Sequence, residues 1–208
     1  IRAPSLDRHA AAMLVWMAGC VFFLGLLLHR SGIVRRRVEQ AQEAADELLH
    51  LLAACRRQMR LRAPVRLKLS DSSLSPAVCG LWRPVILLPR SLVDKLSALQ
   101  LRAVVLHEMA HVQRGDVWVN YAQTLLQIVY WWHPLVWLAN AYIRRVREEA
   151  VDERVMVALG RESDTYPSTL IEVAKHALAR PLLSLGLVGI LESKSSLKRR
   201  IHRLLQRQ

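Results

Sequence analysis

Residues 97–116 of the chain, SALQLRAVVLHEMAHVQRGD, contain the signals that decide the fold. Ser97 and Gln100 have the spacing of a capping box at the start of a helix. Apolar residues then recur at helical spacing to about Gln113, and Gly115 is a typical residue just past a helix end. We therefore expect one helix from about residue 98 to residue 113.

This helix carries an HExxH sequence, HEMAH at residues 107–111. His107 and His111 lie four residues apart, so their imidazoles project from one face and can reach one tetrahedral ion. The pattern predicts Zn²⁺ as the cofactor, with both histidines as ligands. Glu108 stands beside the first ligand and is the candidate general base for a zinc-activated water.

A catalytic zinc ion takes a third protein ligand, and residues 147–153, REEAVDE, offer one on an expected helix. We expect Glu148 to be this ligand. Asp152 shares its helix face and is expected to accept a hydrogen bond from the other ring nitrogen of a zinc-bound histidine. An ordinary charged helix face is the alternative. Asp116 could orient a histidine or cap the following helix.

The segment between His111 and Glu148 has to begin and end on the same side of a bilayer, because one ion must contact ligands at both of its ends. Residues 117–143 contain no Asp, Glu, Lys or Arg. A single crossing of a bilayer about 30 Å thick would separate Glu148 from the histidines, and two crossings need about 40 residues. We therefore expect a helical hairpin with arms 117–132 and 135–143, which turns at His133-Pro134. Its first arm should face protein with three polar residues, Asn120, Gln123 and Gln127.

A second apolar segment, residues 10–28, has no charged residue and is long enough for a transmembrane helix. A signal peptide is the alternative. Arg30 and residues 35–37, RRR, follow it, so we expect the downstream side to be cytoplasmic. Because residue 1 is Ile, we also expect the chain to be part of a longer protein.

The remaining segments predict a mainly α-helical fold with a small β-sheet. Apolar spacing favours one amphipathic helix over residues 34–61. Residues 65–70 alternate as a strand does, and residues 85–88 suit a strand at the sheet edge, which could hold an extended peptide or be covered by a loop. We divide the chain into residues 1–33, a transmembrane helix with its flanks, and residues 34–208, a metallopeptidase domain facing the cytoplasm.

The end of the chain gives weaker signals. Residues 181–191 are apolar but too few to cross a bilayer, so a buried or interfacial position is favoured. Residues 194–207 are basic with apolar residues at helical spacing, which suits a helix lying on anionic lipid.

Composition excludes several classes of protein. An apolar content of 52% excludes a mainly disordered chain. Cys20, Cys55 and Cys79 are far apart and form no disulfide framework, which favours a reducing compartment. A net charge of +13 indicates an anionic partner, either a membrane surface or a nucleic acid. We expect the lipid bilayer and no direct nucleic-acid binding, because no recognised nucleic-acid-binding motif is present.

Several of these motifs resemble the membrane metallopeptidase domain of the BlaR/MecR antibiotic-sensor family. The likeness runs from the first span to the final RIHRLL, and it rests on Ser75-Pro76, GLWRP at 80–84, ILLP at 86–89, HEMAHVQRGD at 107–116, HPLVW at 133–137, and Arg147-Glu148 with Asp152. It implies a gluzincin-like zinc site at the cytoplasmic face of a bacterial inner membrane, with His107, His111 and Glu148 as ligands and Glu108 as the catalytic glutamate. In such proteins an extracellular sensor activates the peptidase, which often cleaves itself, and a cytoplasmic DNA-binding repressor is inactivated by proteolysis.

The leading hypothesis is thus a membrane-bound zinc endopeptidase of a signal-transduction system, which cleaves itself or a cytoplasmic repressor. A housekeeping membrane protease of the CAAX-processing or heat-shock type shares the HExxH and ExxxD patterns and is the alternative. A third possibility is a receptor module without catalysis. Glu108 argues against that, since a purely structural zinc site needs no general base.

Overall fold

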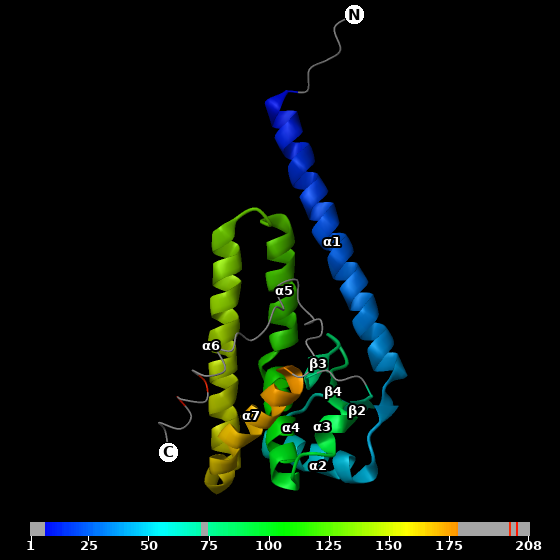
Figure 1. Cartoon of the computed structure of the whole chain (residues 1–208), viewed down its shortest axis with the longest axis vertical. Coiled ribbons are helices and arrows are strands. Elements are labelled where there is room, and N and C mark those ends of the chain that lie inside the picture. The colour runs from blue at the N-terminus through cyan, green and yellow to red at the C-terminus, as the bar shows by residue number, and fades with distance from the viewer. Residues whose placement is uncertain (1–6, 72–74, 179–199, 201–202, 204–208) are drawn as a thin grey trace, which may run out of the picture.

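A computed structural model of the chain describes residues 7–71, 75–178, 200 and 203. Helices dominate, with one small mixed sheet (Figure 1). The sheet, the short helices and the HExxH helix form the base of the molecule, and α1 (Arg8–Gln40) rises from it beside a helical hairpin. The predicted fold class is therefore confirmed.

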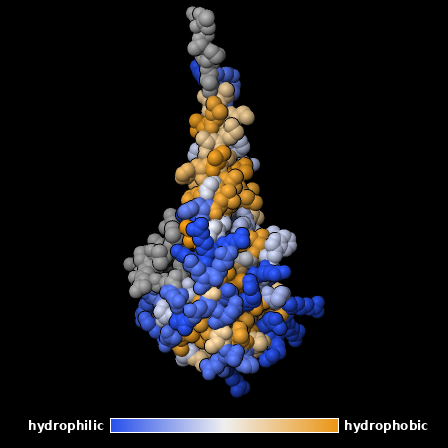
Figure 2. All heavy atoms as spheres, turned by 90° about the vertical axis from the view of Figure 1, so that its right-hand side faces the viewer, coloured by the Kyte–Doolittle hydropathy of each residue, from blue (hydrophilic) through white to orange (hydrophobic). Residues whose placement is uncertain are grey.

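Helix α1 is the one helix among the described residues that is long and apolar enough to cross a membrane. It has 33 residues, and none of them is buried by the rest of the protein. On the face shown in Figure 2, hydrophobic side chains gather on the projecting part and hydrophilic ones on the base. Helix α1 continues without a break past residue 33, so its course marks no domain boundary at that point. The division of the chain into residues 1–33 and 34–208 stays a prediction.

The single helix expected over residues 34–61 is wrong. Helix α1 ends at Gln40 and strand β1 (Gln42–Glu43) follows. Helix α2 (Asp46–Gln58) begins after Ala45, which has an extended backbone conformation. The break has a tertiary cause, because β1 pairs with β2 (Arg66–Ser70) and Lys68 Nζ donates to the carbonyl oxygens of Val38 and Ala41 at the end of α1. The apolar face of α2 is nonetheless buried as the spacing indicates.

The strand order is β1-β2-β4-β3, with β3 at Ala77–Cys79 and β4 at Val85–Pro89. Strand β4 pairs in parallel with β2 and antiparallel with β3. The expected edge position of residues 85–88 is therefore wrong. All five residues of β4 are buried, as a continuous apolar run with strands on both sides should be. Strands β1 and β3 are the two edges of this sheet instead.

The core lies where α2, α4 (Ala98–Arg114) and α6 (Pro134–Leu159) pack with the sheet. A short helix α3 (Arg90–Val93) links β4 to α4, and a 3₁₀ turn (Gly160–Thr165) links α6 to α7 (Tyr166–Leu178). The most deeply buried apolar side chains come from β2, β4, α4 and α6: Leu67, Ile86, Leu88, Val105, Leu106, Met109, Val151 and Val155.

The expected ends of α4 are confirmed. Ser97 and Gln100 form the capping box, and Gly115 ends the helix in the left-handed conformation with φ of 70°. This glycine lets α5 (Asp116–Val129) leave α4 at once in a new direction.

The expected hairpin is also confirmed. Helix α5 ends at Val129, slightly earlier than predicted, and α6 begins with Pro134 as its first residue. Gln123 and Gln127 are buried, and Gln123 Nε2 donates to Asn140 Oδ1 at 3.2 Å across the hairpin. The tip contacts α1, since the Trp16 indole donates to the Val129 carbonyl oxygen and the Trp131 indole to that of Trp16. The hairpin therefore stands against the candidate membrane span.

The predictions for residues 181–191 and for most of residues 194–207 lie outside the described residues. Cys20, Cys55 and Cys79 are all free, and the sequence predicted no disulfide framework for them.

Candidate metal centre

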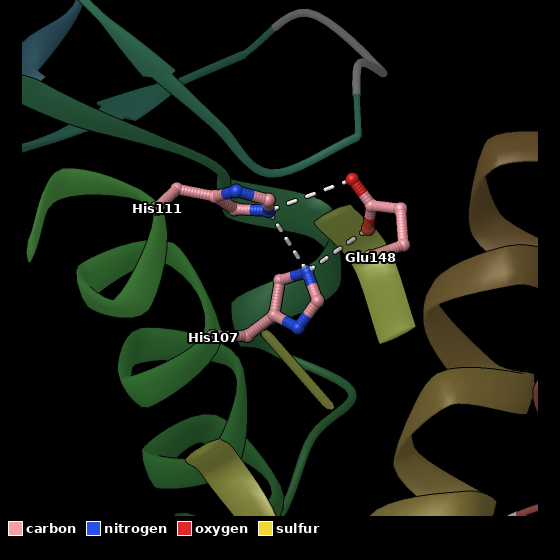
Figure 3. A group of neighbouring side chains, drawn as sticks. All are labelled: His107, His111 and Glu148. Carbon is pink, nitrogen blue, oxygen red and sulfur yellow. Dashed lines mark hydrogen bonds and ion pairs between the residues drawn. The ribbon is translucent and has the colours of Figure 1, made fainter. Parts of the chain in front are cut away.

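Helix α4 presents the two imidazoles of HExxH to each other. His107 Nε2 and His111 Nε2 are 3.3 Å apart, and the rings are inclined by 80° (Figure 3). The sheet and α6 pack around this helix, so the histidines occupy fixed positions at the edge of the core. Glu108 between them is 6% exposed.

Glu148 joins this pair from α6, as Figure 3 shows. Its Oε2 lies 3.6 Å from His107 Nε2, and its Oε1 lies 3.8 Å from His111 Nε2. One ligand atom from each of the three residues fits within 4.8 Å of the others. The return of α6 through the hairpin thus places Glu148 beside the histidines, as the sequence argument requires.

The donor set fits a tetrahedral ion. Two nitrogens, each about 2.0–2.1 Å from such an ion, are about 3.3–3.4 Å apart. The observed separation of 3.3 Å between the two imidazoles matches this value. Each imidazole lies 3.6–3.8 Å from a different oxygen of Glu148, and one ligand atom from each of the three residues lies within 4.8 Å of the others. The three side chains could therefore hold a metal ion once the Glu148 carboxylate moves closer to both imidazoles.

The other ring nitrogen of each histidine is held by a hydrogen bond. His111 Nδ1 lies 2.8 Å from Asp116 Oδ2, and His107 Nδ1 lies 2.8 Å from the Tyr166 hydroxyl oxygen. Because the Tyr166 hydroxyl donates its own proton to Asp152 Oδ1 at 2.7 Å, its oxygen accepts from His107. Both Nδ1 atoms are thus held as donors, so in the neutral imidazoles both Nε2 atoms keep a lone pair for a metal.

Asp152 is linked to His107 through the Tyr166 hydroxyl and not directly. The expected direct hydrogen bond to a histidine is not made, because Asp152 Oδ1 is 3.7 Å from His107 Nδ1 and the Tyr166 hydroxyl bridges them. Asp116 makes the direct bond instead, to His111. Its side chain does not cap α5, so of the two roles left open for this residue the geometry favours orienting the histidine.

Arg200 brings a counter-charge to the two carboxylates of α6. It donates to both oxygens of Asp152 at 2.8 Å, and its Nη1 lies 3.4 Å from Glu148 Oε2. Two-pronged contacts of this kind are the strongest that arginine makes with a carboxylate. Arg203 similarly pairs with Glu149 at 2.8 Å.

Burial and charge compete at each titrating group. Burial alone would raise the pKa of Glu148, but the hydrogen bond with His107 and the charges of both histidines and Arg200 lower it far below its ordinary value. Burial raises the pKa of Glu108, and the two histidines oppose this while Glu148 adds to it. Burial would lower the pKa of His111, yet the hydrogen bond to Asp116 and the surrounding carboxylates raise it.

The cluster opens into a cavity of about 790 Å³. The walls come from α1, β3, α4, α5, α6 and α7, and they include the edge strand residues 77–79. Arg144 and Arg147 of α6 also line this cavity, next to Glu148 along the chain. Burial, together with the charge of Arg147, lowers the pKa of Arg144.

Two partners in this centre were missed by sequence reasoning. Tyr166 has no flanking motif and lies 59 positions from His107 in the chain, and Arg200 lies 48 positions from Asp152. The HExxH residues, Glu148 and Asp152 all lie on helices with recognisable spacing. Tyr166 has no such spacing, and Arg200 begins the RIHRLL segment of the family likeness, which gives no indication that the arginine contacts Asp152.

Two histidines on an HExxH helix and a glutamate from a later helix, arranged around a space for one ion, define the class of metallopeptidase-type sites. The chain belongs to the family described as BlaR1 peptidase M56, whose model matches residues 4–204.

Named relatives agree with this assignment. The chain is 31% identical over 156 residues to the regulatory protein BlaR1 of Bacillus licheniformis, an overlap of 74% of this chain and 26% of the relative. It is 21% identical over 153 residues to the methicillin resistance mecR1 proteins of Staphylococcus aureus and Staphylococcus epidermidis, with 72% of this chain and 26% of each relative covered. The chain thus spans about a quarter of the length of these relatives.

Proposed function

We propose that this chain is the catalytic part of a membrane-bound zinc endopeptidase in a signal-transduction system. The observation that carries the proposal is the convergence of His107, His111 and Glu148, with both Nε2 atoms left free by their Nδ1 partners. Two imidazoles and one carboxylate form a set that catalytic zinc sites use, and they leave a fourth position for water. Membership of a peptidase family supports the same conclusion.

Each residue has a distinct part in the proposed hydrolysis. A zinc ion held by His107, His111 and Glu148 would supply Lewis acidity, which lowers the pKa of water to about 7. Glu108 takes a proton from the water as its oxygen attacks the peptide carbonyl carbon, and passes this proton to the amine nitrogen as the C–N bond breaks. Asp116, and Asp152 through Tyr166, keep the histidines oriented.

The edge strand β3 gives this centre a way to hold an extended peptide. Residues 77–79 line the cavity that contains the cluster, and β3 pairs with β4 on one side only among the described residues. Unpaired backbone groups of an edge strand can bind an extended chain as an added strand. A protein substrate rather than a small molecule is therefore proposed.

The proposed location is the inner membrane of a bacterium, with the centre facing the cytoplasm. Helix α1 serves as the membrane span, and the arginines at 35–37 lie toward its base end. The names of the relatives, a regulatory protein and methicillin resistance proteins, support a role in signalling. The proposed substrates are a cytoplasmic repressor or the protein itself.

The metal is tested with substitutions in the purified full chain. We expect His107→Ala and Glu148→Ala to lose stoichiometric zinc in elemental analysis, and Glu108→Ala to keep it. His50→Ala, which changes an exposed histidine on α2, is the matched control and should keep zinc. Zinc retained in both His107→Ala and Glu148→Ala would refute the ligand assignment.

Catalysis is tested by comparative proteomics of cells that carry the intact protein, Glu108→Ala, or Glu47→Ala as an exposed control. We expect a fragment of a repressor-like protein, or of this protein, that is present with the intact and Glu47→Ala forms and absent with Glu108→Ala. Damaged membrane proteins as the main substrates would favour the housekeeping alternative. Unchanged fragments in Glu108→Ala, with zinc retained, would favour a receptor module without catalysis.

A further inference from the structure

Arg144 and Arg147 form a pair of cations for which the described part of the chain supplies no carboxylate. Both line the cavity of the metal cluster, and both are partly buried. Neither forms an ion pair with any described residue. By contrast, Arg145 on the same helix pairs with Glu149 at 3.0 Å and does not line the cavity. Arg145, which does not line the cavity, thus has a carboxylate partner, and the two arginines of α6 that line the cavity have none among the described residues.

The pair also has unused hydrogen-bonding capacity. Arg147 Nε is buried without a hydrogen-bond partner, and Arg147 Nη1 reaches only the backbone oxygen of Asp116 at 3.4 Å. An unsatisfied donor in a buried position is costly, and two neighbouring guanidinium groups repel each other. An anion placed between them would relieve both costs, and a carboxylate suits guanidinium groups best because it accepts two parallel hydrogen bonds.

We propose that Arg144 and Arg147 form a subsite for a carboxylate of the peptide that enters this cavity, either an Asp or Glu side chain or the free C-terminus. This inference rests on the proposed peptidase function and adds a substrate preference to it. The peptide is favoured over a lipid phosphate because the pair shares one cavity with the metal cluster and the edge strand β3.

The helix sets the distance between this subsite and the bond to be cut. Arg144 precedes Glu148 by four residues, so it lies on the same face of α6 and about 6 Å away along the axis. An extended peptide advances about 3.3 Å per residue. For a peptide that runs along α6, the recognised carboxylate is therefore about two residues from the scissile bond.

Cleavage specificity provides the first test. The full chain, purified in detergent, is incubated with a proteome-derived peptide library, and the residues around each cut are counted. We expect Asp, Glu or a free C-terminus to be enriched about tenfold at one position near the cut bond, since a hydrogen bond to a charged group contributes about 1.5–3 kcal/mol. Arg144→Gln and Arg147→Gln should lose the enrichment, and the matched control Arg145→Gln should keep it. If the wild type cleaves peptides without this enrichment, or if the enrichment is unchanged in both cavity variants, the inference is overturned.

Binding provides a second test, which does not depend on catalysis. Immobilised Glu108→Ala protein, loaded with zinc, selects from two random hexapeptide pools, one with free and one with amidated C-termini. Enrichment of Asp and Glu in both pools identifies a side-chain carboxylate, and retention confined to the free pool identifies the C-terminus. Either result supports the subsite if Arg144→Gln abolishes it while zinc stays bound.

The outcomes separate the inference from the function on which it rests. If the wild type cleaves no peptide in the library but the binding preference is found, the peptidase function fails and the subsite stands. If cleavage occurs without an acidic preference, the subsite fails and the function stands. Vesicles of phosphatidylglycerol are included as a further probe. If Arg144→Gln weakens vesicle binding and neither peptide assay changes, the pair binds lipid phosphate and the inference is overturned.

Discussion

Replacing Tyr166 with Phe tests whether the tyrosine hydroxyl orients His107. The hydroxyl accepts from His107 Nδ1 at 2.8 Å and donates to Asp152 Oδ1 at 2.7 Å, and the residue is 1% exposed. Phe keeps the ring and its packing, so the substitution removes one oxygen from a buried network. Water has little access to replace it.

The magnitude follows from the groups left behind. His107 Nδ1–H loses its partner, while Asp152 keeps the two hydrogen bonds from Arg200. An unsatisfied buried polar group costs about 1–3 kcal/mol, so the free energy of unfolding should fall by roughly 2 kcal/mol. Because His107 is then free to turn or to change its tautomer, zinc affinity should fall about 10- to 100-fold.

The assay is competition for zinc with a chromogenic chelator, together with thermal unfolding of the metal-free protein. Tyr142→Phe is the matched control, since Tyr142 is an exposed residue of α6 and should change neither quantity. If Tyr166→Phe binds zinc as tightly as the wild type, the tyrosine does not position His107, and the argument from the Nδ1 partners is refuted.

Three further substitutions probe the helices around the centre. Asp116→Asn removes the negative charge that accepts from His111 Nδ1–H at 2.8 Å, so zinc affinity should fall about tenfold in the same competition assay; unchanged affinity would contradict the orienting role. Gly115→Ala meets no neighbouring atom but must adopt φ of 70°, so thermal unfolding should report a loss of about 1–2 kcal/mol, and no loss would mean that this turn is not left-handed. Met109→Ala empties a fully buried position, and chemical denaturation should show a loss of about 2–5 kcal/mol; a value under about 1 kcal/mol would place Met109 outside the core.

Features that are set by short stretches of chain could be predicted from the sequence. The limits of α4 follow from Ser97, Gln100 and Gly115, whose side chains and backbone preferences act within one turn. The hairpin needed one further argument, that Glu148 and His107 must meet on one side of a bilayer. Because that constraint is topological, it held although α5 ends at Val129 and not at residue 132.

Features that depend on sheet pairing could not be predicted. Ala41 and Ala45 have good helix propensity, but the pairing of Gln42 with Leu69 makes the extended conformation more favourable at this point. The apolar run in β4 fits an edge strand or a central one equally well until its neighbours are known. Its central place follows from its pairing with both β2 and β3.

The periodicity of α6 explains why the candidate centre was more predictable than the sheet. Arg144, Glu148 and Asp152 follow one another at intervals of four residues, so one face of one helix presents a residue of the proposed carboxylate subsite, the third candidate ligand and the acceptor of the Tyr166 hydroxyl. Each step along this face is about 6 Å, which is close to two residues of an extended peptide. The spacing of Glu148 and Asp152 was enough to place both near the histidines, because they share one helix face, whereas nothing in the pattern singled out Arg144 or the bridging hydroxyl between Asp152 and His107. The partners that come from elsewhere, such as Tyr166, have no such regular spacing to reveal them.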